Sequence, residues 1–216
     1  MAYEFNGSNQ SLEMTSAVVT AAPLTMACWF YPNNNTANMT LVGINEKNDA
    51  AERFALFALG AVAGDPIRAD TASDGGTIAG NAETSTGFSA STWQHAAGVW
   101  ASTTSRTAYL NGGGAVTNTN AVTPTYLGVT TIGARYATNV LGTFMNGRIA
   151  EVGIWSAALN ADEILSLSKG VTCDKVRPQS LVFYAPLVRN LQDVRGGLTI
   201  TNNNTATVAV HPRVYT

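Results

Sequence analysis

The chain has 216 residues, of which 45% are hydrophobic and only 12% are charged, and its formal net charge is −2. This length allows one sizeable hydrophobic core. A near-neutral balance without clusters of lysine and arginine argues against nucleic acid or an anionic membrane as a partner. No apolar run approaches the roughly 20 residues of a membrane span, and the first residues lack the basic and apolar regions of a signal peptide.

The first half of the chain alternates short apolar stretches with turn residues, which is the pattern of successive β-strands. We expect strands at residues 3–5, 11–14, 24–31, 39–44 and 54–59. Both faces of the stretch from Leu24 to Tyr31 are apolar, which predicts a central strand covered on both sides. Residues 60–87 are rich in glycine and turn pairs, so only weak strands are expected there, near Ile67 and Ile78.

The second half continues the same pattern. Strands are expected at residues 93–100, 106–110, 127–134 and 181–187, with weaker ones at 198–201 and 208–210. Asn111-Gly112 is the strongest short signal for a hairpin turn. The Thr- and Asn-rich stretch from Val116 to Val122 is typical of an exposed edge strand. Many short strands at this spacing indicate a two-sheet antiparallel sandwich or jelly roll.

One short helix is expected near residues 161–169. Asn160 stands at the N-cap position and Glu163 follows three residues later, which is the spacing of a capping box. Gly170 is placed to end the helix in a left-handed conformation. A helix of about eight residues is not stable alone, so it must lie on an apolar surface.

The apolar face of this helix is expected to contain Ile164 and Leu167, which lie three residues apart, and to be widened by Leu165. The strand that precedes the helix has its own irregularity. Its apolar spacing slips between Ile149 and Val152, which predicts a β-bulge.

Four segments, in this order, resemble the laminin-G-like, concanavalin-A-like jelly-roll family that pentraxins and legume lectins share. They are YEFNGSNQSLEM, LTMACWFYP, the strand pair from Trp93-Gln94-His95 to Asn111-Gly112, and the stretch from Gly147 to Ile164. The resemblance covers residues 3–170 and implies an all-β fold of two curved antiparallel sheets. We expect one domain, 1–216, in which residues 181–216 form a C-terminal extension or closing strands.

The same fold also carries glucan hydrolases, which need two carboxylates about 5–5.5 Å apart when they retain configuration. Glu151 is the only carboxylate in the strand before the helix, and no second carboxylate lies in register with it. We therefore expect no enzymatic activity. Glu151 is expected to make a structural hydrogen bond or to pair with a nearby arginine, with Arg148 as the candidate.

Histidines and cysteines are few. His95 is expected to be a hydrogen-bonded strand residue, and His211 to be exposed near the C-terminus; two isolated histidines do not indicate zinc. Cys28 lies in an apolar stretch and is expected to be a buried thiol, whereas Cys173 follows the helix. A disulfide between the two is the less favoured alternative.

Many lectin-like relatives bind calcium through oxygen atoms of their loops. Five residues of this chain are candidates for such a site: Asn45, Asp49, Asp65, Asp70 and Asp74. Their spacing matches no known motif, so they are expected to be turn formers, with calcium left open. Trp100, Tyr126 and Tyr136 are candidates for stacking on sugar rings, although core packing accounts for them equally well.

The leading hypothesis for function is a non-enzymatic structural or adhesion protein, namely a bacteriophage virion component such as a capsid decoration or accessory head or tail protein. Two observations favour the virion hypothesis: the composition is poor in charge and rich in Thr, Ala and Asn, and no signal peptide is expected from the first residues. The main alternative is a secreted or surface carbohydrate-binding module, with or without calcium, and a third hypothesis is a glycan-active enzyme whose carboxylates cannot be paired from the sequence. Expected partners are virion proteins or cell-surface glycans, and a homo-oligomer is expected.

Overall fold

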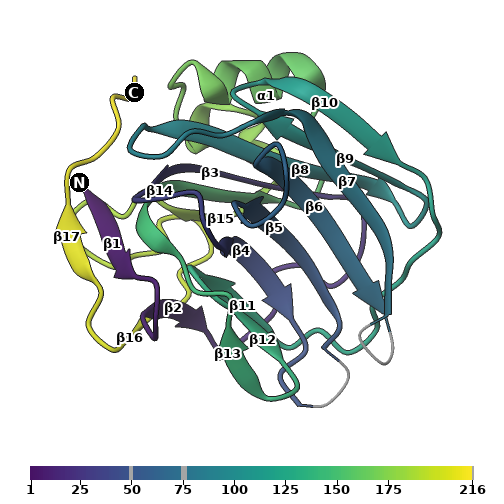
Figure 1. The fold of residues 1–216 in the computed structure, drawn as a ribbon, viewed down its shortest axis with the longest axis horizontal. Helices are drawn as coiled ribbons and strands as arrows, with labels where there is room; N and C mark the ends of the chain where they lie inside the picture. Colours follow the sequence, from purple (N-terminus) through teal and green to yellow (C-terminus); the bar gives the residue numbers. More distant parts are fainter. Residues whose placement is uncertain (49–50, 74–76, 216) are drawn as a thin grey trace.

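The computed structural model describes residues 1–48, 51–73 and 77–215, and within them the chain forms two large antiparallel sheets packed face to face (Figure 1). This arrangement confirms the predicted all-β sandwich. The first sheet of the described residues, sheet A, runs in the order β10 (Gly113–Asn118), β9 (Ser105–Leu110), β8 (Gln94–Ser102), β3 (Leu24–Pro32), β14 (Asn146–Trp155), β1 (Ala2–Asn6) and β17 (Thr207–Ala209). A further strand, β15 (Leu181–Ala185), pairs with the second half of β14.

The second sheet, sheet B, lies against the first. In the described part of the chain it runs in the order β16 (Thr201–Asn203), β2 (Ser11–Met14), β11 (Val129–Ile132), β4 (Asn38–Asn45), β5 (Arg53–Leu59), β6 (Pro66–Ser73) and β7 (Thr77–Gly87). A small hairpin of β12 (Arg135–Ala137) and β13 (Val140–Gly142) follows β11. The described helices are α1 (Ala161–Ser168) and the 3₁₀ turns η2 (Cys173–Lys175) and η3 (Pro178–Ser180).

The main core lies between the two sheets. Side chains alternate across a strand, so every second residue faces the opposite sheet. Met26 and Phe30 of β3 and Trp100 of β8 point into this core and are fully buried. Phe54 of β5 meets the Trp100 ring edge to face, with ring centroids 5.8 Å apart. Burial of each such side chain contributes about 1.5–3 kcal/mol, which is the main favourable term for this fold.

A second apolar cluster lies on the other side of sheet A, between that sheet and α1. It includes Ala27 and Ala97 from the sheet and Ile164 and Leu167 from the helix. The prediction that β3 is covered on both sides is therefore confirmed where Ala27 meets this cluster. Leu165 is 42% exposed, so the prediction that it widens the buried helix face is wrong.

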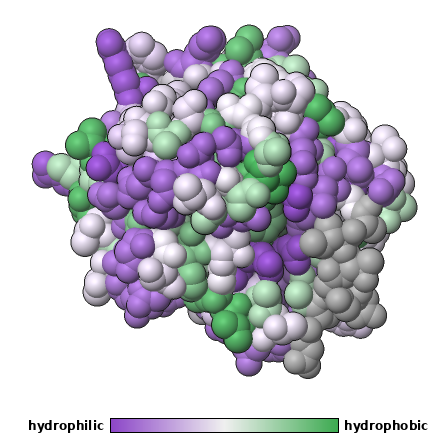
Figure 2. Space-filling view, in the orientation of Figure 1, coloured by the Kyte–Doolittle hydropathy of each residue, from purple (hydrophilic) through white to green (hydrophobic). Residues whose placement is uncertain are grey.

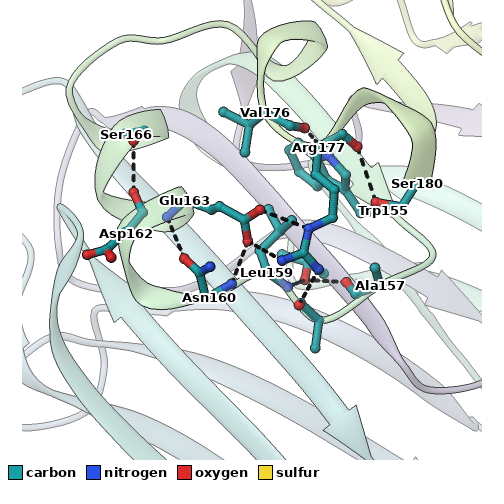
Figure 3. Close-up of polar contacts among 12 residues, drawn as sticks. Trp155, Ala157, Leu159, Asn160, Asp162, Glu163, Ser166, Val176, Arg177 and Ser180 are labelled. Atoms are coloured by element: carbon teal, nitrogen blue, oxygen red, sulfur yellow. Dashed lines mark hydrogen bonds and ion pairs between the residues drawn. The ribbon is translucent and has the colours of Figure 1, made fainter.

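The predicted start and end of the helix are both confirmed, and Figure 3 shows the contacts at its start. The Asn160 side chain accepts a hydrogen bond from the Glu163 backbone N–H at 2.9 Å, and the Glu163 carboxylate accepts one from the Asn160 backbone N–H at 2.7 Å. The same carboxylate also binds the Arg177 guanidinium through two contacts, at 2.8 and 2.6 Å. Gly170 has φ +94°, the left-handed conformation expected after the helix.

The predicted bulge and hairpin are also present. The register of β14 against β3 shifts between Ala150 and Gly153, and Glu151 has φ +52° there. Asn111 and Gly112 both have positive φ and connect β9 to the edge strand β10. That edge strand begins at Gly113 and ends at Asn118, earlier than the predicted stretch from 116 to 122.

The two weak strands expected near Ile67 and Ile78 both form, and they are longer than the local sequence indicates. The segment forms β6 and β7, of eight and eleven residues, and β6 pairs with β5 on one side and β7 on the other. Alanine, threonine and glycine give these strands little hydrophobic pattern of their own. Pairing with neighbouring strands of sheet B, on both sides of β6 and on one side of β7, supplies the stabilisation that the local sequence lacks. The predicted turn at Asp74-Gly75-Gly76 lies outside the described residues.

The C-terminal residues extend both sheets. β15 pairs with β14, β16 with β2 and β17 with β1. The two chain ends consequently lie together at one side of the molecule (Figure 1). In the same orientation, Figure 2 shows hydrophilic residues interleaved with neutral and apolar ones, as expected of a charge-poor sequence. Among the described residues, no helix is long and apolar enough to span a membrane.

Candidate functional site

The outer face of sheet B carries the charged residues from which a site can be built. Phe54 and Leu56 of β5 point into the core, so Arg53 and Phe57 of the same strand point outward. The next strand, β6, likewise turns Ile67 and Ala69 into the core, and its two charged residues lie on the other face. This face therefore combines arginine side chains with apolar ones, whereas α1 covers part of the outer face of sheet A.

A cavity of about 150 Å³ lies on this face, under the β12–β13 hairpin. It is lined by residues of three strands of sheet B and by the hairpin and the residue after it: Asn38, Arg53, Phe57, Leu59, Arg68, Asp70, Arg135 and Thr143. Phe57 and Leu59 belong to a small apolar cluster on this face. They are almost fully buried and contribute apolar lining beside the polar side chains.

Arg53 and Asp70 form a buried ion pair within this lining. Their side chains are 4% and 0% exposed, and the Arg53 Nε lies 2.7 Å from an Asp70 carboxylate oxygen. Burial raises the pKa of Asp70, and the Arg53 guanidinium opposes that shift. A second arginine, Arg68, donates from Nε to Glu83 at 2.8 Å on the neighbouring strand. Each of these two arginines thus has its own carboxylate.

Arg135 is held differently. Its guanidinium lies over the Phe57 ring, 5.8 Å from the centroid, and its Nη1 donates to the Tyr136 carbonyl oxygen at 3.2 Å. Its Nε is enclosed and has no hydrogen-bond partner among the described residues. Burial, and secondarily repulsion from Arg53, lower the pKa of Arg135. The lining therefore includes one guanidinium with an unused donor.

The aromatic candidates for sugar stacking have different positions. Trp100 is fully buried in the core, where its Nε1 donates to the Thr71 hydroxyl at 2.8 Å. Tyr136 is also buried, and its hydroxyl donates to Glu13 at 2.8 Å. Tyr126 is 71% exposed and lines a cavity of about 260 Å³ together with Lys47. Of the three, Tyr126 is the one that offers an accessible ring.

The five calcium candidates do not come together. Asp70 pairs with Arg53, Asp65 accepts a hydrogen bond from the Asn35 side chain, and the Asn45 amide donates to a threonine. Asp49 and Asp74 lie outside the described residues. Within the described ranges, His, Cys, Asp and Glu nowhere gather in a group of three or more that suits a metal ion. Calcium dependence stays a prediction.

Glu151 has a structural role, but with other partners than predicted. The Tyr184 hydroxyl donates to one of its carboxylate oxygens at 2.5 Å, and His211 Nε2 lies 3.1 Å from the other. Arg148 instead pairs with Glu4 at 3.4 Å. Glu151 is the residue with positive φ in the bulge, and both of its partners come from the C-terminal part of the chain. His211 is 13% exposed in this contact, so the prediction of an exposed histidine is wrong.

His95 is 2% exposed, and its ring packs edge to face against Trp29 at 5.6 Å. The Asn111 side chain accepts a hydrogen bond from its backbone N–H, while the ring Nδ1 has no partner among the described residues. Burial lowers the pKa of His95 to about 3. Cys28 and Cys173 are free and buried, and burial raises the pKa of both thiols.

Two other cavities are less suited to a ligand that needs free polar groups. The one beside the helix, of about 360 Å³, is lined by Glu163 and Arg177, which satisfy each other (Figure 3). The one beside the C-terminal segment, of about 570 Å³, contains Glu151, which is already bonded to Tyr184 and His211.

Sequence reasoning missed Arg53, Arg68 and Arg135 as candidates. One signal was available, because Arg68 and Asp70 are two residues apart and share a strand face in a chain with few charges. The positions of Arg53 and Arg135 beside them depend on strand register and on the folded hairpin.

Comparison with solved structures places this fold among known ones. The native heptameric SAP-like pentraxin of Limulus polyphemus is 13% identical with a TM-score of 0.66, over 96% of this chain and 97% of that one. A putative carbohydrate-binding protein of Bacteroides ovatus is 19% identical with a TM-score of 0.62; the alignment covers 96% of this chain and 61% of that protein. Domain 4 of the Geobacillus stearothermophilus arabinanase AbnA, in complex with arabinotriose, is 18% identical with a TM-score of 0.61; the alignment covers 77% of this chain and 76% of that domain's chain.

No curated protein matches the sequence. The sequence model of the Concanavalin A-like lectin/glucanases superfamily matches residues 6–165, which is most of the chain. This range contains three of the four segments whose order suggested the resemblance and the first of them from Asn6 onward, together with every residue that lines the cavity under the hairpin. The chain belongs to the concanavalin A-like lectin/glucanase superfamily.

Proposed function

We propose that this chain is a non-catalytic carbohydrate-binding module that holds a glycan in the cavity between the outer face of sheet B and the β12–β13 hairpin. The observation that carries the proposal is the mixed lining of this cavity. Phe57 and Leu59 offer apolar surface, while the Asn38 amide and the arginines offer polar groups. A sugar ring has the same mixture of apolar C–H and polar O–H groups.

The size of the cavity limits what it holds. Its volume of about 150 Å³ is smaller than the roughly 300–1,000 Å³ of pockets for drug-sized ligands. We therefore expect one sugar unit to enter, with the rest of the glycan outside. The exposed ring of Tyr126, beside the separate cavity with Lys47, offers a second surface for units beyond the first.

The comparisons favour this reading over the virion hypothesis. Two of the similar structures are a putative carbohydrate-binding protein and an arabinanase domain in complex with arabinotriose. None of the similar structures described above is a virion component, and the bacteriophage role that the composition suggested has no support. An extracellular location and a homo-oligomeric state remain predictions that accompany the proposed function.

A glycan array probed with the full chain tests the proposal, with two matched variants of the hairpin. Thr143 lines the cavity, whereas Thr138 is exposed on the same hairpin, and both have positive φ. Thr143→Trp should fill the cavity entrance and abolish binding to every glycan that the parent chain retains. Thr138→Trp should leave binding unchanged. No glycan binding by the parent chain, or equal binding by both variants, would refute the proposal.

Calcium is tested in the same experiment. The positive groups of the cavity are guanidinium groups, which need no metal. We therefore expect array binding to persist in EDTA. Loss of binding on chelation, restored by added calcium, would instead show that a metal outside this lining supports the site.

A further inference from the structure

The charges around the cavity do not cancel. Its ionic groups are three guanidinium groups and two carboxylates, counting the partner of Arg68: Arg53, Arg68, Arg135, Asp70 and Glu83. Three positive charges against two negative ones leave one positive charge. The two ion pairs identify its location, since Arg53 and Arg68 have their own carboxylates. The excess charge lies on Arg135.

Arg135 also has a donor without a hydrogen-bond partner among the described residues. The guanidinium N–H groups form a planar fork that matches both oxygens of a carboxylate. Nη1 is occupied by the Tyr136 carbonyl, whereas Nε is enclosed without a hydrogen-bond partner in the described residues. A buried N–H group in a folded protein is nearly always satisfied, so an unpaired one calls for an explanation.

We propose that the cavity selects a sugar that bears a carboxylate, and that Arg135 binds this carboxylate. This inference rests on the proposed function and specifies its ligand class. An entering carboxylate would accept a hydrogen bond from the unused Nε of Arg135 and would neutralise the excess positive charge of its guanidinium. The buried contact of Asp70 with Arg53 keeps Arg53 from competing for the ligand.

The position of Arg135 makes it a specificity residue. It comes from the β12–β13 hairpin, while Phe57 beneath it belongs to sheet B. The ring of Phe57 supports the guanidinium plane and limits its rotation. A sugar carboxylate is therefore met by a donor of fixed orientation, whereas a neutral hydroxymethyl group at the same position could accept from Nε but would not balance the charge of the guanidinium.

Isothermal titration and ligand-observed NMR with matched sugars test this inference. The probes are methyl glucuronide and the methyl glycoside of N-acetylneuraminic acid, each compared with its neutral carboxyl methyl ester. We expect at least one acid to bind about ten- to a hundredfold more tightly than its ester, as for hydrogen bonds between charged groups.

Variants separate the geometry of Arg135 from its charge. Arg135→Lys keeps the charge without the fork, and Arg135→Gln removes both; we expect each to lose most of the preference for acid over ester. The matched control is Arg148→Gln, because Arg148 also lies over an aromatic ring, 4.9 Å from the Tyr31 centroid, but on sheet A. It should bind as the parent chain does.

The outcomes distinguish the two proposals. If acid and ester bind equally, or if only sulfated sugars bind, the carboxylate inference is overturned and the carbohydrate-binding function stands. If the parent chain binds no acidic or neutral glycan, both fail. A preference for the acid that survives in Arg135→Gln would also overturn the role of Arg135.

Discussion

Replacing Glu163 with alanine removes three interactions of one carboxylate. The side chain accepts from the Asn160 backbone N–H, binds the Arg177 guanidinium through two contacts, and lies in the first turn of α1, where the helix dipole favours negative charge (Figure 3). It joins the helix start to the segment after the helix. The side chains of Glu163 and Arg177 are 22% and 27% exposed, so solvent screens their contact only in part.

The expected cost follows from these contacts. A hydrogen bond to a charged group contributes about 1.5–3 kcal/mol, and the helix dipole about 0.3–1 kcal/mol. After allowance for solvent screening, we expect Glu163→Ala to lower the free energy of unfolding by about 2–4 kcal/mol. At about 2–4 °C per kcal/mol for a chain of this size, Tm should fall by about 4–16 °C.

Thermal and urea unfolding, followed by circular dichroism, provide the measurement. Asp162 is the matched control, because it is acidic, exposed and in the same helical turn. Asp162→Ala should cost only the dipole contribution, about 0.3–1 kcal/mol. A double-mutant cycle of Glu163 with Arg177 should give a coupling of about 1–3 kcal/mol. Equal losses of stability for Glu163→Ala and Asp162→Ala, or a coupling energy near zero between Glu163 and Arg177, would refute the reasoning.

Three further predictions concern buried ionisable groups. Asp70→Asn leaves Arg53 charged and buried, so it should lower the free energy of unfolding in urea by about 3–5 kcal/mol. The control Glu83→Gln breaks a partly exposed ion pair and should cost less than about 1 kcal/mol. Similar losses for Asp70→Asn and Glu83→Gln would contradict this prediction. Because the pKa of His95 is lowered to about 3, unfolded chains bind a proton below pH 6.5 while folded ones do not, and stability should fall by about 1.4 kcal/mol per pH unit from 6.5 towards 3. An NMR midpoint near 6.5 for this ring would oppose that expectation. Both cysteines should resist a thiol reagent at pH 8 until urea is added, whereas rapid labelling of the folded chain would show that they are accessible.

Local signals accounted for the features that depend on neighbouring residues. The capping box of Asn160 and Glu163 lies within four residues, and the Asn111-Gly112 turn within two. The bulge at Glu151 was visible as a slip in apolar spacing. In each case the backbone conformation follows from interactions along the chain, so the sequence predicts it before any packing is known. The order of four such segments was enough to indicate the family.

Packing decided the rest. β6 and β7 form although their residues show little hydrophobic alternation, because neighbouring strands supply the ladder. Glu151 meets Tyr184 and His211, which come from the C-terminal part of the chain, rather than Arg148. The candidate cavity joins β4, β5, β6 and a folded hairpin. By itself the sequence determined the two-sheet sandwich and the capping residues of its helix. Strand register and the placement of the hairpin depend on distant segments, and only they brought Arg135 over the ring of Phe57.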